Sequence, residues 1–402
     1  MNPIAAARTD TDSRVHEVGA PETPRAHAIR CFESAQHLDA LRETVARPQW
    51  RDQVQAQWED WRTALEWTLT KQGNILLGQR LVGALETAWW VLPDADAQHW
   101  IRAAFEVSDE MTPRNVRARL NLALARLRLQ HQRFKACEKA AERALAQARD
   151  VGDEVGVARA EFLIGHSMVV LGELRKGERL LESALVRFRK LGARRSIGRT
   201  LASLALAREH ADDILAACSL CAQAVDVLKE IEGENGEIDH VSYLAELEFR
   251  AGNAQEALRM VSEALVGHRK RNERPHVIVD LSNAAAYSLA LNRYDEAAAS
   301  GREALAMAVA EKDELWTAFA LQHLAAIEAL QGDGSRAARV LGFVNARINQ
   351  LEHPREFTEQ QEYERVMAAL RNRLRNGEVE RGIAEGAQLS EDRVLAELRP
   401  GR

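Results

Sequence analysis

Three stretches of the sequence share one pattern: GELRKGERLLESAL at residues 172–185, GNAQEALRMVSEAL at residues 252–265 and NRYDEAAASGREAL at residues 292–305. Each opens on Gly or Asn, carries a small residue at its sixth position and closes on Ala-Leu. The spacing of their starting points, Gly172, Gly252 and Asn292, indicates a repeat of about 40 residues. Repeats of this size are typical of solenoids built from stacked supersecondary units.

Small residues form columns at the same period along most of the chain. One column holds Ala104, Ala144, Ala184, Ala224, Ala264 and Ala304, a second holds Ala97, Cys137, Gly177, Ala217, Ala257, Ala297 and Ala337, and a third holds Ala125, Gly165, Ala205, Ala245, Ala285 and Ala325. Two helices approach within about 8–10 Å only where the side chains at their crossing are short. Since apolar residues at helical spacing lie between the columns, each repeat is predicted to be one helical hairpin in an all-α solenoid.

These columns resemble the tetratricopeptide repeat, in which a small residue lies in the middle of the first helix and Gly or Asn forms the turn. An aromatic or apolar residue then opens the second helix, followed by Ala and Ala-Leu. The resemblance implies a right-handed superhelical solenoid of tetratricopeptide-like hairpins. The period, about 40 residues, is longer than the usual one of about 34 residues. The sixth repeat has Gly334 in place of the aromatic residue, so we expect a weaker, terminal unit there.

The repeats divide the chain into four predicted segments. These are a disordered N-terminus (1–24), a Trp-rich helical cap (25–117), six tetratricopeptide-like repeats (118–345), and C-terminal capping helices with a tail (346–402). Seven of the eight tryptophans lie between Trp50 and Trp100, several of them at helical spacing. An aromatic stripe of this kind is predicted to cover the open end of the array, with an aromatic ligand cage as the alternative.

A wider resemblance spans residues 25–395. It rests on Arg25-Ala-His27 with Phe32, Asp60-Trp-Arg-Thr-Ala-Leu-Glu-Trp67, Leu81-Val-Gly-Ala-Leu85 with Trp89-Trp90, Glu362-Tyr363-Glu364, and Ala384-Glu-Gly-Ala-Gln-Leu-Ser390. These stretches are similar to the C-terminal helical repeat region of bacterial LuxR-type and antibiotic-regulator-type signal-transduction ATPase regulators. The resemblance implies a role in bacterial signalling or transcription regulation, with a separate regulator or ATPase subunit as partner. The ATPase and DNA-binding parts of that family have no counterpart here, since no Gly-rich phosphate loop ending in Lys-Ser or Lys-Thr occurs.

The composition and the motif search make several classes of function improbable. A net charge of −6 argues against direct nucleic-acid binding, and no apolar run approaches the roughly 20 residues that a membrane helix needs. We therefore expect a cytoplasmic protein with reduced, structural thiols. Cys218 and Cys221 have the spacing of half a zinc site but lack a second pair at a matching distance. No catalytic motif is found, so the sequence predicts neither an enzyme nor a cofactor or metal site.

The predicted function is that of a non-catalytic scaffold that binds a protein or peptide segment in its concave groove. The resemblance to the tetratricopeptide repeat implies that the first helices of the repeats line the groove, which selects Arg119, Arg126, Arg159, His166, Arg199, Tyr243 and Asn283. Arg119, Arg159 and Arg199 recur at the period of the repeat, so they are expected to form a ladder that receives an acidic partner. The alternative is a sensor for a small ligand or a signalling peptide.

Overall fold

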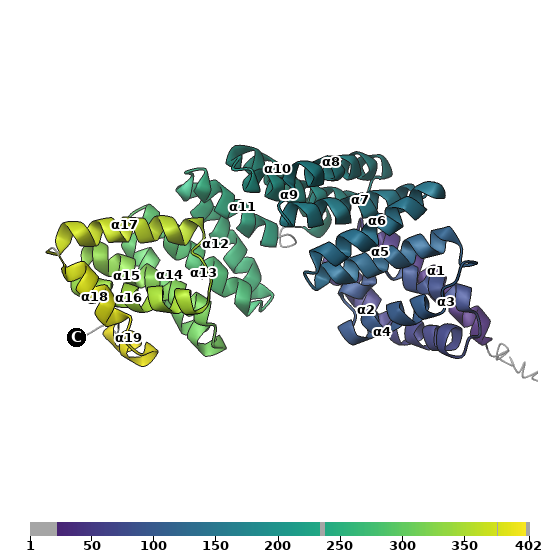
Figure 1. The fold of residues 1–402 in the computed structure, drawn as a ribbon, viewed down its shortest axis with the longest axis horizontal. Helices are drawn as coiled ribbons and strands as arrows, with labels where there is room; N and C mark the ends of the chain where they lie inside the picture. Colours follow the sequence, from purple (N-terminus) through teal and green to yellow (C-terminus); the bar gives the residue numbers. More distant parts are fainter. Residues whose placement is uncertain (1–21, 234–237, 376, 399–402) are drawn as a thin grey trace, which may run out of the picture.

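The computed structural model describes residues 22–233, 238–375 and 377–398, and every regular element in these ranges is helical (Figure 1). The segment predicted to be disordered lies, except for residues 22–24, outside the described residues. The N-terminal elements are α1 (Pro24–Leu41), α2 (Arg47–Leu65), a π-helical turn (Glu66–Thr70), α3 (Ile75–Ala84), a 3-10 turn (Ala88–Trp90) and α4 (Asp94–Glu106).

Six helical hairpins follow, as the repeat predicts. They are α5 (Arg114–Gln130) with α6 (Phe134–Asp150), α7 (Glu154–Val170) with α8 (Leu174–Leu191), α9 (Arg194–His210) with α10 (Ile214–Glu232), α11 (Ile238–Arg250) with α12 (Ala254–Lys270), α13 (Arg274–Ala290) with α14 (Tyr294–Glu311), and α15 (Glu314–Gln331) with α16 (Gly334–Gln350). The second helices begin at one constant interval, at Phe134, Leu174, Ile214, Ala254, Tyr294 and Gly334, which confirms the period. The chain ends in α17 (Phe357–Arg373), α18 (Glu378–Gly386) and α19 (Glu391–Glu397).

Left-handed residues end the helices at intervals of half a repeat, except between Asp212 and Gly252, where the interval is a whole repeat. They are Gln132, Gly152, Gly172, Gly192, Asp212, Gly252, Asn272, Asn292 and Lys312. A residue with positive φ just after a helix satisfies the last carbonyl groups and reverses the chain, and Gly adopts this conformation without strain. The predicted turns at Gly172, Gly252 and Asn292 follow this rule. The turn at Gly332 does not, because its φ is −110°.

The columns of small residues lie at the helix crossings. Ala144, Ala184, Ala224 and Ala264 have no exposed surface. At the crossing of α7 with α8, a Cβ atom added to Gly165 would lie 2.8 Å from the Gly177 carbonyl oxygen. Short side chains are therefore needed for the two helices of a hairpin to touch, as the sequence predicted.

Both terminal segments cover the ends of the array. The Trp-rich segment packs Trp50, Trp58 and Trp61 into one apolar cluster that continues into Leu120 and Leu127 of α5. At the other end α17 to α19 cover α16, and the Leu370 and Leu374 side chains lie beside Gly334, within 3.4–3.6 Å of where its Cβ would be. Side chains at the end of α17 and just after it therefore cover Gly334, where the sixth repeat lacks the aromatic residue.

The terminal helices also reach across the inner face of the array. The repeats form an arch with the N-terminal and C-terminal halves at opposite ends (Figure 1). The end of α1 forms polar contacts with α7 and α9, far along the sequence. Helix α17 contacts α11 and α13 as well as its neighbour α15. The first helices of the repeats therefore face other helices over much of their inner side. Among the described residues, no helix is long and apolar enough to cross a membrane.

Enlarging a crossing residue should destabilise the protein. Ala184→Leu or Ala264→Leu is expected to lower the free energy of unfolding by about 1–3 kcal/mol, because a close crossing cannot absorb three extra carbon atoms without strain. Chemical denaturation followed by circular dichroism measures the change. Arg189→Ala, at an exposed position on α8, is the control and should change stability by less than about 0.5 kcal/mol. Equal stability of the Leu variants and the control would show that the crossing is placed wrongly.

Candidate functional site

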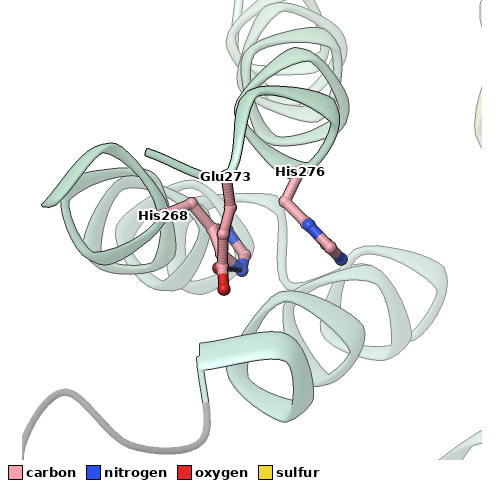
Figure 2. Close-up of side chains that lie close together, drawn as sticks. All are labelled: His268, Glu273 and His276. Atoms are coloured by element: carbon pink, nitrogen blue, oxygen red, sulfur yellow. Dashed lines mark ion pairs between the residues drawn. The ribbon is translucent and has the colours of Figure 1, made fainter. Parts of the chain in front are cut away.

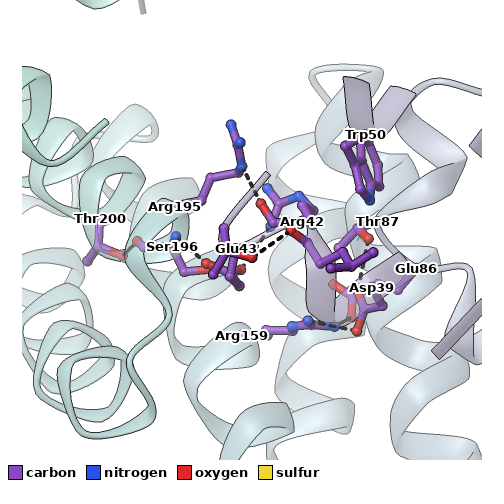
Figure 3. Close-up of polar contacts among 12 residues, drawn as sticks. Asp39, Arg42, Glu43, Trp50, Glu86, Thr87, Arg159, Arg195, Ser196 and Thr200 are labelled. Carbon is purple, nitrogen blue, oxygen red and sulfur yellow. Dashed lines mark hydrogen bonds and ion pairs between the residues drawn. The ribbon is translucent and has the colours of Figure 1, made fainter. Parts of the chain in front are cut away.

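A buried cluster of charges joins the Trp-rich segment to the first two repeats (Figure 3). Glu86 follows α3 and is fully buried. One of its carboxylate oxygens accepts hydrogen bonds from Arg126 Nη2 at 2.8 Å and Nε at 3.0 Å, and the other accepts one from Arg159 Nη1 at 2.9 Å. Asp39 on α1 accepts a hydrogen bond from Arg159 Nη2 at 2.9 Å and a second from the Thr87 hydroxyl, also at 2.9 Å. Two guanidinium groups on successive repeats are thus satisfied by carboxylates of the same chain.

The segment that follows α1 continues these contacts onto the third repeat. Arg195, on α9, donates to the backbone carbonyl groups of Arg42 and Val45, each at 2.6 Å. The Glu43 carboxylate accepts hydrogen bonds from the backbone N–H of Ser196 at 2.9 Å and from its hydroxyl at 2.8 Å. The end of α1 therefore lies on the inner face of three repeats, held by charged and backbone hydrogen bonds.

The charges of this cluster are strongly coupled. Burial alone would raise the pKa of Glu86, but Arg159, Arg126 and Arg119 outweigh it and hold that pKa at about 2. For Arg42 the neighbouring cations disfavour the charged form instead of stabilising it. Burial, together with the neighbouring cations Arg126 and Arg159, lowers the pKa of Arg42 to about 10 despite its contact with Glu43. Arg126, Arg159 and Arg195 therefore lie close enough to Arg42 to oppose its charge.

Two pockets adjoin the end of α1. The larger, with a volume of about 940 Å³, lies between α1, α3 and the starts of the first three repeats. Arg80 and Arg119 line it, together with Val151 and Leu191, two large apolar side chains that are 43% and 42% exposed. The smaller pocket has a volume of about 210 Å³. It is lined by Arg42, Arg47, Arg126, Arg195 and Arg199, with Trp50, Thr87, Trp90, Val91 and His240 completing its wall.

The three arginines of the predicted ladder, Arg119, Arg159 and Arg199, have different surroundings, and the middle one is buried. Arg119 forms an ion pair with Asp153 at 2.9 Å and lines the larger pocket. Arg159 is only 7% exposed, because Asp39 and Glu86 cover it. The Arg199 guanidinium lies 6.0 Å from the centre of the Trp90 ring, within cation–π distance. Reversing all three charges would therefore break the fold at Arg159, so these residues cannot be tested as one unit.

The other predicted site residues lie apart from each other. His166 stacks on Phe162, and its Nδ1 lies 3.0 Å from the Ser203 hydroxyl. Burial, with a smaller contribution from Arg199, lowers the pKa of His166 to about 4, so this imidazole is neutral near pH 7. Arg126 belongs to the cluster around Glu86, on the same inner face.

Tyr243 and Asn283 lie in the C-terminal half of the array. The Tyr243 hydroxyl donates to Glu209, and Asn283 is 8% exposed on α13. Beside Asn283, buried His323 bridges the Ser282 hydroxyl at 2.7 Å and the Glu362 carboxylate at 2.8 Å. The structure thus divides the predicted groove residues between two polar regions rather than one continuous surface.

Sequence reasoning missed the acidic half of the N-terminal cluster, namely Asp39, Glu43 and Glu86. One signal was available. Glu86 interrupts the apolar run from Leu81 to Trp90, and a carboxylate in such a run needs a buried partner. The sequence alone does not say which arginines supply it.

No protein-family profile matches the chain, and no curated protein matches it in sequence. Solved structures of low sequence identity share its fold. The apo form of RapI is 13% identical, with a TM-score of 0.58 over 89% of this chain and 99% of that one. A signal-transduction ATPase with a tetratricopeptide repeat sensor, from Pyrococcus horikoshii, is 14% identical, with a TM-score of 0.55 over 85% of this chain and 54% of that one. The apo quorum sensor NprR from B. thuringiensis is 12% identical, with a TM-score of 0.52 over 86% and 98%. The chain therefore has a tetratricopeptide-like repeat fold.

Removing the charge of Glu86 should destabilise the protein in a pH-dependent way. Glu86→Gln leaves Arg126 and Arg159 buried without a shared carboxylate, which is expected to cost about 3–5 kcal/mol near pH 7. Because folding lowers the pKa of Glu86 from 4.5 to about 2, its ionised form stabilises the folded state above about pH 4.5, and that contribution is lost as the pH falls towards 2. Thermal melts of both proteins at several pH values measure the difference.

Glu59→Gln is the matched control, since Glu59 is exposed on α2. It should melt like the unmodified protein at every pH. A Glu86→Gln variant that melts like this control at pH 7 would contradict the description of the charge cluster.

Proposed function

We propose that the chain is a non-catalytic interaction scaffold that binds an acidic segment of a partner protein or peptide beside the end of α1. The observation that carries the proposal is that five arginine side chains line the smaller pocket. Arg126 and Arg195 already pair with Glu86 and Glu232, so their charge, rather than unused donors, would attract an acidic group. Its volume of about 210 Å³ suits one carboxylate-bearing side chain or a chain terminus rather than a whole ligand. A concentration of arginine side chains favours an anionic partner through charge complementarity.

The larger pocket is suited to the rest of such a segment. Val151 and Leu191 offer apolar surface at its mouth, and Arg80 is exposed beside them. A segment with an apolar side chain next to its acidic group would bury that side chain here, which contributes affinity, while the charge contributes specificity. Arg119, from the predicted ladder, lies in this pocket, and Arg126 and Arg199 lie in the smaller one.

A sensor function for a small ligand or signalling peptide is the second candidate. It is favoured by the volume of the larger pocket, about 940 Å³, which lies within the range of small-molecule sites. Two proteins of similar fold are described as sensors, which supports the same candidate. Binding of an acidic signalling peptide would agree with both the scaffold and the sensor function. Binding of a small neutral ligand would agree only with the sensor function.

Selection from a random peptide library displayed on phage tests the proposal and defines the chemistry of the preferred partner. Immobilised protein should enrich peptides that carry Asp or Glu next to an apolar residue. A synthetic peptide of the selected sequence, followed by fluorescence anisotropy at low salt, should bind at least ten times more weakly to the double variant Arg47→Glu, Arg199→Gln. The loss follows from the removal of two positive charges and the introduction of one repelling carboxylate.

Arg189→Glu supplies the matched control, because it changes an exposed arginine on the outer helix α8. This variant should bind the peptide as the unmodified protein does, and circular dichroism should report the same helix content for all three proteins. Enrichment of neutral or basic peptides, or equal affinity of the double variant and the control, would exclude the acidic partner.

A further inference from the structure

A second group of polar side chains lies at the junction of the fourth and fifth repeats, away from the pockets beside α1. His268 is in the last turn of α12, Glu273 directly precedes α13, and His276 is in the first turn of α13. Asn272 between them has a φ of 56°, so the chain reverses and brings the two helix ends together. The two imidazole rings are stacked, with their centres 4.9 Å apart. Figure 2 shows the three side chains together at this junction.

His268 is oriented by a buried carboxylate. Its Nδ1 lies 2.6 Å from Asp280 Oδ2, and both side chains are 1% exposed. The other oxygen of Asp280 accepts a hydrogen bond from the Ser242 hydroxyl on α11, at 2.7 Å. A carboxylate held against Nδ1 fixes the orientation of the ring, with Nε2 on the side of Glu273. Metal-binding histidines are commonly held by a carboxylate in this manner.

Glu273 supplies a carboxylate oxygen at the same place. Its Oε2 lies 3.9 Å from His268 Nε2. This oxygen is buried and has no hydrogen-bond partner, although the Arg271 Nε atom is 3.5 Å away. A buried carboxylate oxygen without a hydrogen bond is costly unless another group satisfies it. Arg271 contributes charge but no hydrogen bond, so the oxygen retains its capacity to bind a ligand.

The geometry points to a zinc site formed by His268, Glu273 and His276 at the junction of α12 and α13. One ligand atom from each residue lies within 4.8 Å of the other two. Two imidazoles and one carboxylate are a donor set that Zn²⁺ favours, and a water molecule would complete four-coordination. This site could not be predicted from the sequence, because the His-x4-Glu-x2-His spacing forms a cluster only through the left-handed turn at Asn272.

Zinc binding requires a small movement of two of the three ligands. Zinc–ligand bonds of about 2.0–2.2 Å place tetrahedral ligand atoms roughly 3.3–3.6 Å apart, which is closer than the present separations. His268 is fixed by Asp280, whereas the Glu273 side chain is 35% exposed and His276 is exposed. Rotation of these two side chains closes the site without moving a helix. The bound ion would link the fourth repeat to the fifth, where a repeat array depends on contacts between neighbours.

Isothermal titration of the untagged full-length chain with ZnCl₂ at pH 7.5, after treatment with a chelator, tests the site. One zinc ion per chain is expected to bind. His276→Ala and Glu273→Gln should each weaken binding at least tenfold, because each removes one of three ligands. Asp280→Asn should weaken it about 10–100-fold without touching the ion. Zinc should also raise the melting temperature of the unmodified protein but not that of His276→Ala.

His210→Ala is the matched control, since His210 is also exposed and also lies at a helix end. It should bind zinc as the unmodified protein does. His276 is exposed, so its replacement is expected to leave the fold intact, which circular dichroism checks. Absence of zinc binding, or binding that His276→Ala leaves unchanged, would overturn the assignment. Zinc binding that is lost equally in His210→Ala would place the ion elsewhere and would overturn it too.

Discussion

The N-terminal half of the molecule depends on one buried carboxylate, Glu86, which two arginines of successive repeats share. Taking three charges out of water is costly, and the cost is offset only because each guanidinium donates well-placed hydrogen bonds to the same group. Asp39 and Glu43 extend this arrangement to α1 and the third repeat. The end of α1 is therefore held on the inner face of the array. The two pockets, and with them the proposed binding site, lie beside it.

The repeat explains how much of this architecture could be predicted from the sequence. Columns such as Ala144, Ala184 and Ala224 fix the helix crossings, so the hairpins and their period follow from spacing. The inward direction of Arg126 and Arg159 follows from the resemblance to the tetratricopeptide repeat. The partners of those arginines do not. A periodic pattern predicts which side chains of the repeats face inward. It does not predict their partners, Asp39 and Glu86, because these lie in the N-terminal segment, which has no repeat. For the same reason Arg159 was expected to receive a partner, whereas the structure has it buried against Asp39 and Glu86.

The junction of the fourth and fifth repeats shows a second limit of sequence reasoning. His268, Glu273 and His276 match no known metal motif, and their juxtaposition depends on a single residue with positive φ. One proposed site lies beside α1, which is outside the repeats. The other lies at an inter-repeat turn of the usual kind, but its three side chains as a set have no counterpart one repeat earlier or later.

A double-mutant cycle between Asp39 and Arg159 tests most directly whether α1 is held on the inner face. The free energy of unfolding would be measured for Asp39→Asn, Arg159→Gln, the double variant and the unmodified protein. The contact at 2.9 Å predicts a coupling energy of about 1–3 kcal/mol, because each single change removes the same ion pair. A parallel cycle between Asp39 and the exposed Arg189 should give a coupling near zero. If the Asp39–Arg159 cycle also gave a coupling near zero, α1 would not lie where the structure has it.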